Sequence, residues 1–256
     1  MTNGESHRNI QLIVAYDGTM FSGWQRQRNK RTIQGCIEAV LEKMHKKHIL
    51  LNAAGRTDTG VHAVGQCVNF FTDIQRIPAA NFVFALNSML PQDIRIRAAR
   101  EVPDDFHARF SAKSRTYRYH IICGIKNFPH KSRYSMQINR RLDIKLLQDY
   151  ARLLRGEIDC SLFASPSDQI FQRGTGSKYR AIINSCFFVE RETVIFEISA
   201  NAFFRRMVRS IVGTLMYYEE KKIKADEFTE ILKSGERSMA GPTAPSNGLF
   251  LWHIEY

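Results

Sequence analysis

The feature that most constrains this chain is the order in which its hydrophobic periodicity changes. From residue 9 to residue 102, segments that alternate apolar and polar side chains are separated by segments whose apolar side chains recur with helical spacing. Their order is β-α-β-β-α-β, which is that of the split βαβ or ferredoxin-like unit. The remainder of the chain repeats this order without a repeat of the sequence itself. The sequence therefore predicts an α+β protein made of two ferredoxin-like halves.

The two halves are expected to meet near residue 104, which gives domains of residues 1–104 and 105–256. In the first half, strands are expected at residues 9–16, 49–54, 64–71 and 93–102, with helices beginning at Thr32 and Pro78. In the second half, strands are expected at residues 114–123, 180–189, 193–200 and 249–256, with helices at 143–154 and 203–218. A further short helix is expected at residues 225–234, before the last strand.

Basic side chains are in excess and are concentrated in two stretches. The 37 Lys and Arg residues outnumber the 25 Asp and Glu residues, which gives a net charge of +12 and favours a polyanionic partner. No acidic residue occurs between Asp105 and Asp143 or between Asp17 and Glu38, and aromatic residues lie among the cations. Cations for phosphates and flat rings for bases suit looped RNA. Solvated basic faces and β-forming tyrosines produce the same pattern, but two such stretches and the net charge together favour RNA.

The sequence lacks the signatures of several other classes of protein. No apolar run reaches the roughly 18 residues of a membrane span, and the polar N-terminus has no signal-peptide pattern. The apolar stripe at residues 203–218 is typical of a core helix, so no membrane partner is expected. Five widely spaced cysteines indicate reduced thiols in a cytoplasmic protein. No zinc, Walker or nucleophile-elbow motif occurs, so catalysis without a metal or nucleotide cofactor is expected.

One loop carries the residues most suggestive of chemistry. The segment Ala54–Ala63 lies between two expected strands, and its two glycines permit a sharp reversal of the chain. This reversal would present Asp58 and Arg56 at the edge of the sheet, where the nearby cation favours an ionised carboxylate. On the residues alone, an aspartate that only caps its own turn explains the loop better than a catalytic one. His62 is interpreted as a packing residue rather than as an acid or base.

The loop Ala54–Ala63 closely resembles the signature loop of the tRNA pseudouridine synthase A family. Five further blocks resemble that family in the same order along the chain, and together they extend over nearly its whole length. They are Tyr16–Gln27 with Thr32–Gly35, Phe106–Ala112, Tyr117–Tyr119, Asn201–Gly213 and Pro242–Leu249. The resemblance implies a pseudouridine synthase fold, with the two halves joined around a basic cleft, and a homodimer.

The resemblance also implies an activity, the isomerisation of uridine to pseudouridine in tRNA, at positions 38, 39 and 40 of the anticodon stem-loop. Asp58 matches the catalytic aspartate, Arg209 the arginine that pairs with it, and Arg56 the loop arginine that displaces the target base. Tyr117 matches the tyrosine of the active site, where it would stack on the uracil. Leu249 would line the uracil pocket. No group is supplied from outside in this reaction, so no cofactor is expected.

Several readings stay open at this level. Asp58 can attack C1′ of the ribose or take the 2′ proton, Arg209 can instead contact a phosphate, and a leucine at the place of Leu249 is more often a core residue. The chain departs from the family pattern at residues 161–180 and at the bulky pair Phe203–Phe204. A non-catalytic RNA-binding protein or tRNA-folding chaperone is the rival class, and a synthase that acts on another RNA is the second enzyme option.

Overall fold

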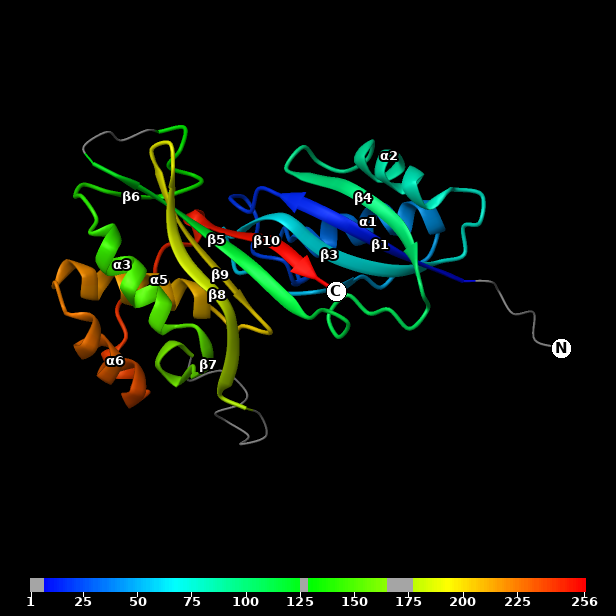
Figure 1. Ribbon diagram of the computed structural model, residues 1–256. Coiled ribbons are helices and arrows are strands. Elements are labelled where there is room, and N and C mark those ends of the chain that lie inside the picture. The colour runs from blue at the N-terminus through cyan, green and yellow to red at the C-terminus, as the bar shows by residue number, and fades with distance from the viewer. Residues whose placement is uncertain (1–6, 125–128, 165–176) are drawn as a thin grey trace. The chain divides into compact units, whose positions relative to one another are not determined.

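The computed structural model describes residues 7–124, 129–164 and 177–256 (Figure 1). The chain divides into two compact units. Unit 1 consists of Met1–Lys113 and Leu251–Tyr256, and unit 2 consists of Ser114–Phe250. The units therefore divide after residue 113, and the last six residues belong to unit 1 rather than to the second half. In the described part of the chain, no helix has the length and apolar character needed to cross a membrane.

Unit 1 has the strand order of a ferredoxin-like sheet. Its elements are β1 (Arg8–Tyr16), α1 (Ile33–His45), β2 (Asn52–Ala53), β3 (His62–Thr72), α2 (Phe82–Asn87) and β4 (Ile94–Val102). The strands lie in the order β4-β1-β3, β2 also pairs with β3, and all of these pairings are antiparallel. Strand β10 (Leu249–Glu255) is also a neighbour of β3.

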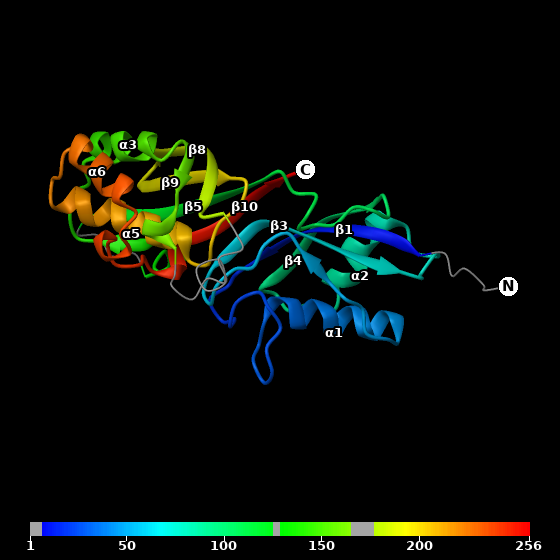
Figure 2. The same cartoon turned by 90° about the horizontal axis from the view of Figure 1, so that it is seen from below.

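Alternation along β1 explains where the core of unit 1 lies. Ile10, Leu12 and Val14 are fully buried, as are Ile33 and Ile37 of α1. Helix α1 lies along one face of the sheet (Figure 2). It begins as the sequence predicts, because the Thr32 hydroxyl accepts a hydrogen bond from the Gly35 N–H at 3.3 Å. The expected strand at 49–54 is wrong in length, because only two of its residues pair with β3.

Unit 2 repeats the arrangement with additional elements. It contains β5 (Ser114–Cys123), β6 (Met136–Ile138), α3 (Ile144–Leu153), β7 (Gly156–Asp159), β8 (Tyr179–Glu190), β9 (Thr193–Ala200), α5 (Met207–Glu220) and α6 (Ala225–Ser234). The strand order is β5-β9-β8-β7, and β6 runs parallel to β5. Helices α3, α5 and α6 gather on one side of this sheet (Figure 1). Phe250 stacks on His120 of β5 with ring centroids 4.6 Å apart, and the start of β10 lies beside β5.

Three features of unit 2 differ from the sequence-based expectation. Strands β6 and β7 were not expected, and helix α5 begins at Met207 rather than at residue 203. The later start has a backbone cause: Arg206, the residue before the helix, has a left-handed φ of 60°, which a continuous right-handed helix excludes. The peculiar loop that departs from the family pattern lies mostly in residues 165–176, outside the described residues.

Candidate active site

The loop that carries Asp58 leaves β2 and enters β3, and three hydrogen bonds hold it, two of them to its backbone. The Trp24 N–H donates to the Thr57 carbonyl at 3.0 Å, and the hydroxyls of Tyr16 and Thr57 are 2.7 Å apart. On the other side, Gln66 of β3 donates from Nε2 to the Gly55 carbonyl at 2.8 Å. Thr57 is buried and Gln66 is fully buried, so water does not compete with these bonds. Gly55 and Thr57, the two residues on either side of Arg56, are therefore held to the body of unit 1.

Close backbone contact supports the same loop from the segment after β1. A Cβ atom added at Gly23 would lie 2.7 Å from the Thr57 carbonyl oxygen, and one added at Gly18 would lie 2.0 Å from the Val61 carbonyl oxygen. Gly23 also has a left-handed φ of 87°, which other residues seldom adopt. These two glycines of the block Tyr16–Gln27 thus let one loop pack directly on the other. The sequence showed the block but gave no indication of its role.

Asp58 is half-buried, and Arg56 is exposed on the same loop. The turn after Asp58 is closed by its main-chain carbonyl, which accepts the Val61 N–H at 3.1 Å. Gly60 has a φ of 76°, so the sharp reversal expected from the glycines of this loop is present. The loop therefore combines a partly accessible carboxylate with a guanidinium two positions away.

His62 follows this turn and is 1% exposed. Its Nδ1 accepts the Gly18 N–H at 3.1 Å and lies 3.2 Å from Oδ1 of Asp17. The same carboxylate oxygen accepts the Thr19 N–H at 3.0 Å. His62 therefore ties the segment after β1 to the start of β3, which is a structural role.

Tyr117 and Arg209, two of the predicted residues in unit 2, lie in different elements. Tyr117 of β5 is 8% exposed, and its ring contacts the edge of Phe203 with centroids 5.2 Å apart. Arg209 lies in the first turn of α5 and donates from Nε to the Ala244 carbonyl at 2.8 Å. The Ala244 N–H in turn donates to the Arg209 carbonyl at 3.1 Å. The side chain and backbone of Arg209 are thus both held by the segment that precedes β10.

The segment between α6 and β10 also contacts the other tyrosine of β5. Tyr119 is fully buried and donates from its hydroxyl to the Pro245 carbonyl at 2.9 Å. Burial raises the pKa of Tyr119 well above its usual value, and the positive charge of Arg209 opposes this only in part. Leu249, at the start of β10, is 5% exposed. The pair Phe203–Phe204, where the sequence departs from the family pattern, also has a partner. The Arg180 guanidinium lies 3.8 Å from the centroid of the Phe204 ring.

Two cations of the basic stretch, Arg118 and Lys131, form ion pairs with acidic side chains from elsewhere in the chain. Arg118 on β5 donates to Glu197 of β9 at 2.7 Å, and Lys131 lies 3.2 Å from Glu192. The stretch is free of acidic residues in the sequence, but β9 and the turn before it bring acidic side chains to it. The density of positive charge at β5 is therefore lower than the sequence predicts.

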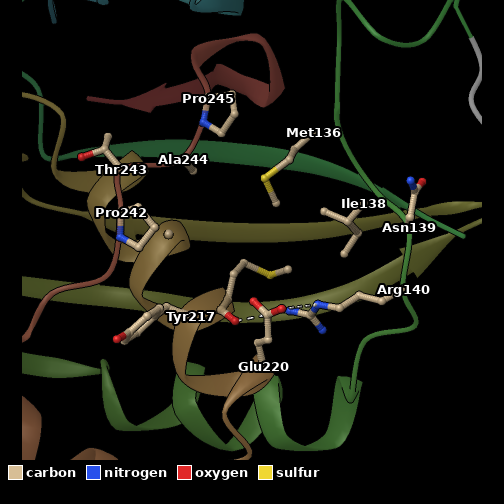
Figure 3. Close-up of a pocket in the computed structure, with 12 residues that line it drawn as sticks. Met136, Ile138, Asn139, Arg140, Tyr217, Glu220, Pro242, Thr243, Ala244 and Pro245 are labelled. Atoms are coloured by element: carbon tan, nitrogen blue, oxygen red, sulfur yellow. Dashed lines mark hydrogen bonds and ion pairs between the residues drawn. The ribbon is translucent and has the colours of Figure 1, made fainter.

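A separate pocket of about 610 Å³ lies in unit 2 between β6, the end of α5 and residues 242–245. Figure 3 shows the Arg140 guanidinium and the Glu220 carboxylate directed at each other in the lining of this pocket, with Nε and Oε1 4.0 Å apart. Glu219, the residue before Glu220, is fully buried and also pairs with Arg140. Burial raises the pKa of Glu219, but its hydrogen bonds outweigh this effect and hold the pKa below its usual value. None of the five predicted site residues lines this pocket.

No group of side chains in residues 7–124, 129–164 and 177–256 has the composition and proximity to hold a metal ion. The cysteines at positions 36, 67, 123, 160 and 186 are all unpaired. Burial raises the pKa of the Cys160 thiol to about 12, so this sulfur is a poor nucleophile and a poor metal ligand near neutral pH. The described residues thus hold neither a metal centre nor an activated thiol.

Comparison with known proteins agrees with this fold. The family described as tRNA pseudouridine synthase matches residues 12–111 and 150–256. A tRNA pseudouridine synthase A of Treponema denticola is 49% identical over 261 residues, which cover 100% of this chain and 96% of the relative. Proteins of the same name from Treponema pallidum and Halalkalibacterium halodurans are 45% and 42% identical, over 92% and 94% of this chain and 84% and 90% of the relatives.

The fold, with its mostly antiparallel strands and five helices among the described residues, is that of the pseudouridine synthases, a class of RNA-modifying isomerases. Within that class, the chain belongs to the tRNA pseudouridine synthase family. This assignment covers both units, because the matched residues include the Asp58 loop of unit 1 and helix α5 of unit 2.

Proposed function

We propose that this protein converts uridine to pseudouridine in the anticodon stem-loop of tRNA, at positions 38, 39 and 40, with Asp58 as the catalytic residue. The observation that carries the proposal is the Asp58 loop. The loop is held by hydrogen bonds with Trp24, Tyr16 and Gln66, while Asp58 is only half-buried. A fixed carboxylate with access to solvent suits a group that must meet a reacting ribose without reorganising.

The reaction breaks the N1–C1′ bond of uridine, turns the uracil and joins its C5 to C1′, and a proton leaves C5. Asp58 either attacks C1′ or removes the 2′ proton, and both routes use an ionised carboxylate. Atoms and electrons balance within the uridine itself, so the proposal includes no cofactor. The target base must leave its stack, at a cost of roughly a few kcal/mol, and we assign its displacement to the exposed Arg56.

We assign supporting roles to three residues of unit 2. Arg209 serves to keep the catalytic carboxylate ionised and oriented through its positive charge. Two hydrogen bonds with Ala244 hold Arg209 itself in position. Tyr117 serves to stack on the uracil and to take the C5 proton, and its perpendicular contact with Phe203 restrains the plane of its ring. Leu249, which is 5% exposed, serves as an apolar wall of the uracil pocket. Two further parts of the proposal come from the sequence: the protein acts as a homodimer, as the family resemblance implies, and in the cytoplasm, as its widely spaced cysteines indicate.

The experiment is carbodiimide-adduct mapping of unmodified tRNA after incubation with wild-type protein, with Asp58→Asn and with Asp73→Asn. Asp73 is the matched control, because it is a carboxylate of unit 1 in a surface ion pair with Lys47, and such pairs contribute little to stability. Wild-type protein and the control are expected to produce adducts at anticodon-arm uridines. Asp58→Asn is expected to lose about 10³-fold in rate and to keep its affinity for tRNA.

Three results would contradict the proposal. If none of the three proteins produces adducts while tRNA is still bound at low salt, the protein is an RNA-binding protein or chaperone. Adducts of equal yield with Asp58→Asn and with wild type would remove Asp58 from the mechanism. Adducts confined to uridines outside the anticodon arm would retain the chemistry but refute the proposed target.

A further inference from the structure

The turn at residues 107–111 of unit 1 exposes an aromatic ring that the proposed mechanism does not use. Phe110 is 77% exposed. Its ring lies beside the imidazole of His107, with centroids 4.4 Å apart and planes inclined by 38°. The Arg109 guanidinium carbon lies 5.7 Å from the centroid of the same ring. A single exposed phenylalanine is common on protein surfaces, but this one is supported by a second ring and a cation.

Hydrogen bonds within the turn fix the backbone on either side of Phe110 and the imidazole beside it. The Ser111 N–H donates to the His107 carbonyl at 2.9 Å, and the His107 N–H donates to Oγ of Ser111 at 3.0 Å. The Arg109 N–H donates to Nδ1 of His107 at 3.1 Å, which also fixes the imidazole. The ring of Phe110 is therefore presented by a preorganised turn, so little conformational entropy is lost when a ligand covers it.

Buried polar groups attach this turn to the sheet of unit 1. Ala108 is fully buried, and its N–H donates to Oδ1 of Asn69 on β3 at 2.9 Å. Its carbonyl accepts from the hydroxyl of Tyr256 at 2.8 Å. Asn9 on β1 donates to the Phe106 carbonyl at 2.9 Å. Both asparagines are fully buried, where an amide is costly unless it is hydrogen-bonded, and here their bonds hold the turn.

The charges near the turn distinguish between ligands. Asp104 and Asp105 precede the turn and are exposed, so the turn is not a concentrated patch of positive charge that would select a phosphate. A flat, uncharged group that stacks on a ring and tolerates a neighbouring guanidinium suits the site better. Unpaired nucleobases have this chemistry, and the net charge of +12 draws their polyanionic backbone to the protein.

We propose that Phe110, supported by His107 and Arg109, is a stacking platform for an unpaired base of the RNA substrate, at a place separate from the Asp58 loop. The proposal rests on the proposed function, because it assumes that RNA is the substrate. Phe110 is a binding residue on this view and takes no part in bond breaking. Its loss is therefore expected to weaken binding and to leave the chemical step unchanged.

The experiment measures the Kd of one unmodified tRNA transcript, at one salt concentration, for wild type, Phe110→Ala, Phe110→Trp and Phe84→Ala. Phe84 is the matched control, because it is a phenylalanine of unit 1 that is 82% exposed on α2. Phe110→Ala is expected to raise Kd about tenfold, since base stacking on aromatic rings contributes on that scale. Phe110→Trp is expected to keep wild-type affinity, and Phe84→Ala to change Kd by less than about twofold.

Two further readouts separate stacking from other roles. The fluorescence of Phe110→Trp is expected to be quenched on saturation with tRNA, and the single-turnover rate of Phe110→Ala at saturating enzyme is expected to equal that of wild type. Equal Kd values for Phe110→Ala and Phe84→Ala, or unquenched emission from Phe110→Trp, would overturn the platform. So would a change of oligomeric state in Phe110→Ala at unchanged Kd. These failures differ from failure of the proposed function, in which wild type itself forms no pseudouridine.

Discussion

Replacing Gly213 by alanine tests how the segment before β10 holds Arg209. A Cβ atom added at Gly213 of α5 would lie 1.7 Å from the Pro242 carbonyl oxygen and 3.0 Å from the Ala244 nitrogen. Ordinary contact requires about 3.5 Å, so the helix and this segment must separate by about 1.5 Å or more. The two hydrogen bonds between Ala244 and Arg209 connect the same two pieces of chain and would be stretched or broken.

The expected loss of stability follows from these contacts. Overpacking at such a site costs about 1–3 kcal/mol, and the two hydrogen bonds, one of them to a guanidinium, contribute about 2–4 kcal/mol more. Alanine is a better helix former than glycine by about 1 kcal/mol, which offsets part of this. The net loss is about 4 kcal/mol, and for a chain of this size it corresponds to a fall in Tm of about 10 °C.

The assay is thermal unfolding followed by circular dichroism, together with the rate of pseudouridine formation at a temperature where the variant remains folded. Gly35→Ala is the control, because Gly35 is also helical but its added Cβ would meet only the Thr32 side chain, at 2.9 Å. We expect a small change in Tm for the control, and for Gly213→Ala a large one with reduced activity. A Gly213→Ala protein that melts within about 1 °C of wild type would refute the reasoning.

Other predictions concern groups whose surroundings the structure defines. The pKa of Glu219 is lower in the folded protein than its ordinary value of 4.5. At pH values above 4.5 its ionised form therefore stabilises the fold, and this contribution is lost as the pH falls through the pKa of the folded state. Glu219→Gln, which weakens the pairing with Arg140, should cost about 2 kcal/mol at pH 7 and flatten the acid side of the stability profile measured by urea unfolding. Thr57→Val removes the 2.7 Å bond to Tyr16 and should lower kcat more than it raises KM in a steady-state assay. Tyr119→Phe should lower the free energy of unfolding by about 1 kcal/mol, measured with urea, because its buried hydroxyl bond is lost.

The sequence predicted those elements whose periodicity is strong over their whole length. Strand β5 has the bounds expected from its alternating pattern, and α3 begins after Asp143, whose carboxylate accepts the Leu146 N–H at 3.0 Å. Strand β7 has the sequence Gly-Glu-Ile-Asp, which carries no such pattern. It is a strand only because β8 lies beside it, and that pairing joins residues about twenty or more positions apart.

The candidate site divides in the same way. The Gly-bracketed loop around Asp58 is a local motif, so the sequence alone singled it out. The groups that hold the loop in place, such as Gln66, have no local signature, because their role depends on which strand lies next to the loop. A search for polar residues at apolar positions of a predicted strand would have singled out Gln66, which is fully buried on β3.

What the sequence by itself determined is the order of the ferredoxin-like elements, the reversal at the Asp58 loop and the family resemblance, since each strand, helix, turn and motif block is recognised from residues close together in the chain. Tertiary structure alone decided which acidic groups neutralise cations such as Arg118. It also decided that the Pro242 carbonyl packs directly on the backbone of Gly213, and that the buried amide of Asn69 on β3 holds the turn of Phe110. The physical reason is that steric contact, hydrogen bonding and ion pairing act over a few ångströms. Local sequence pattern does not reveal which distant residues the fold brings within that range.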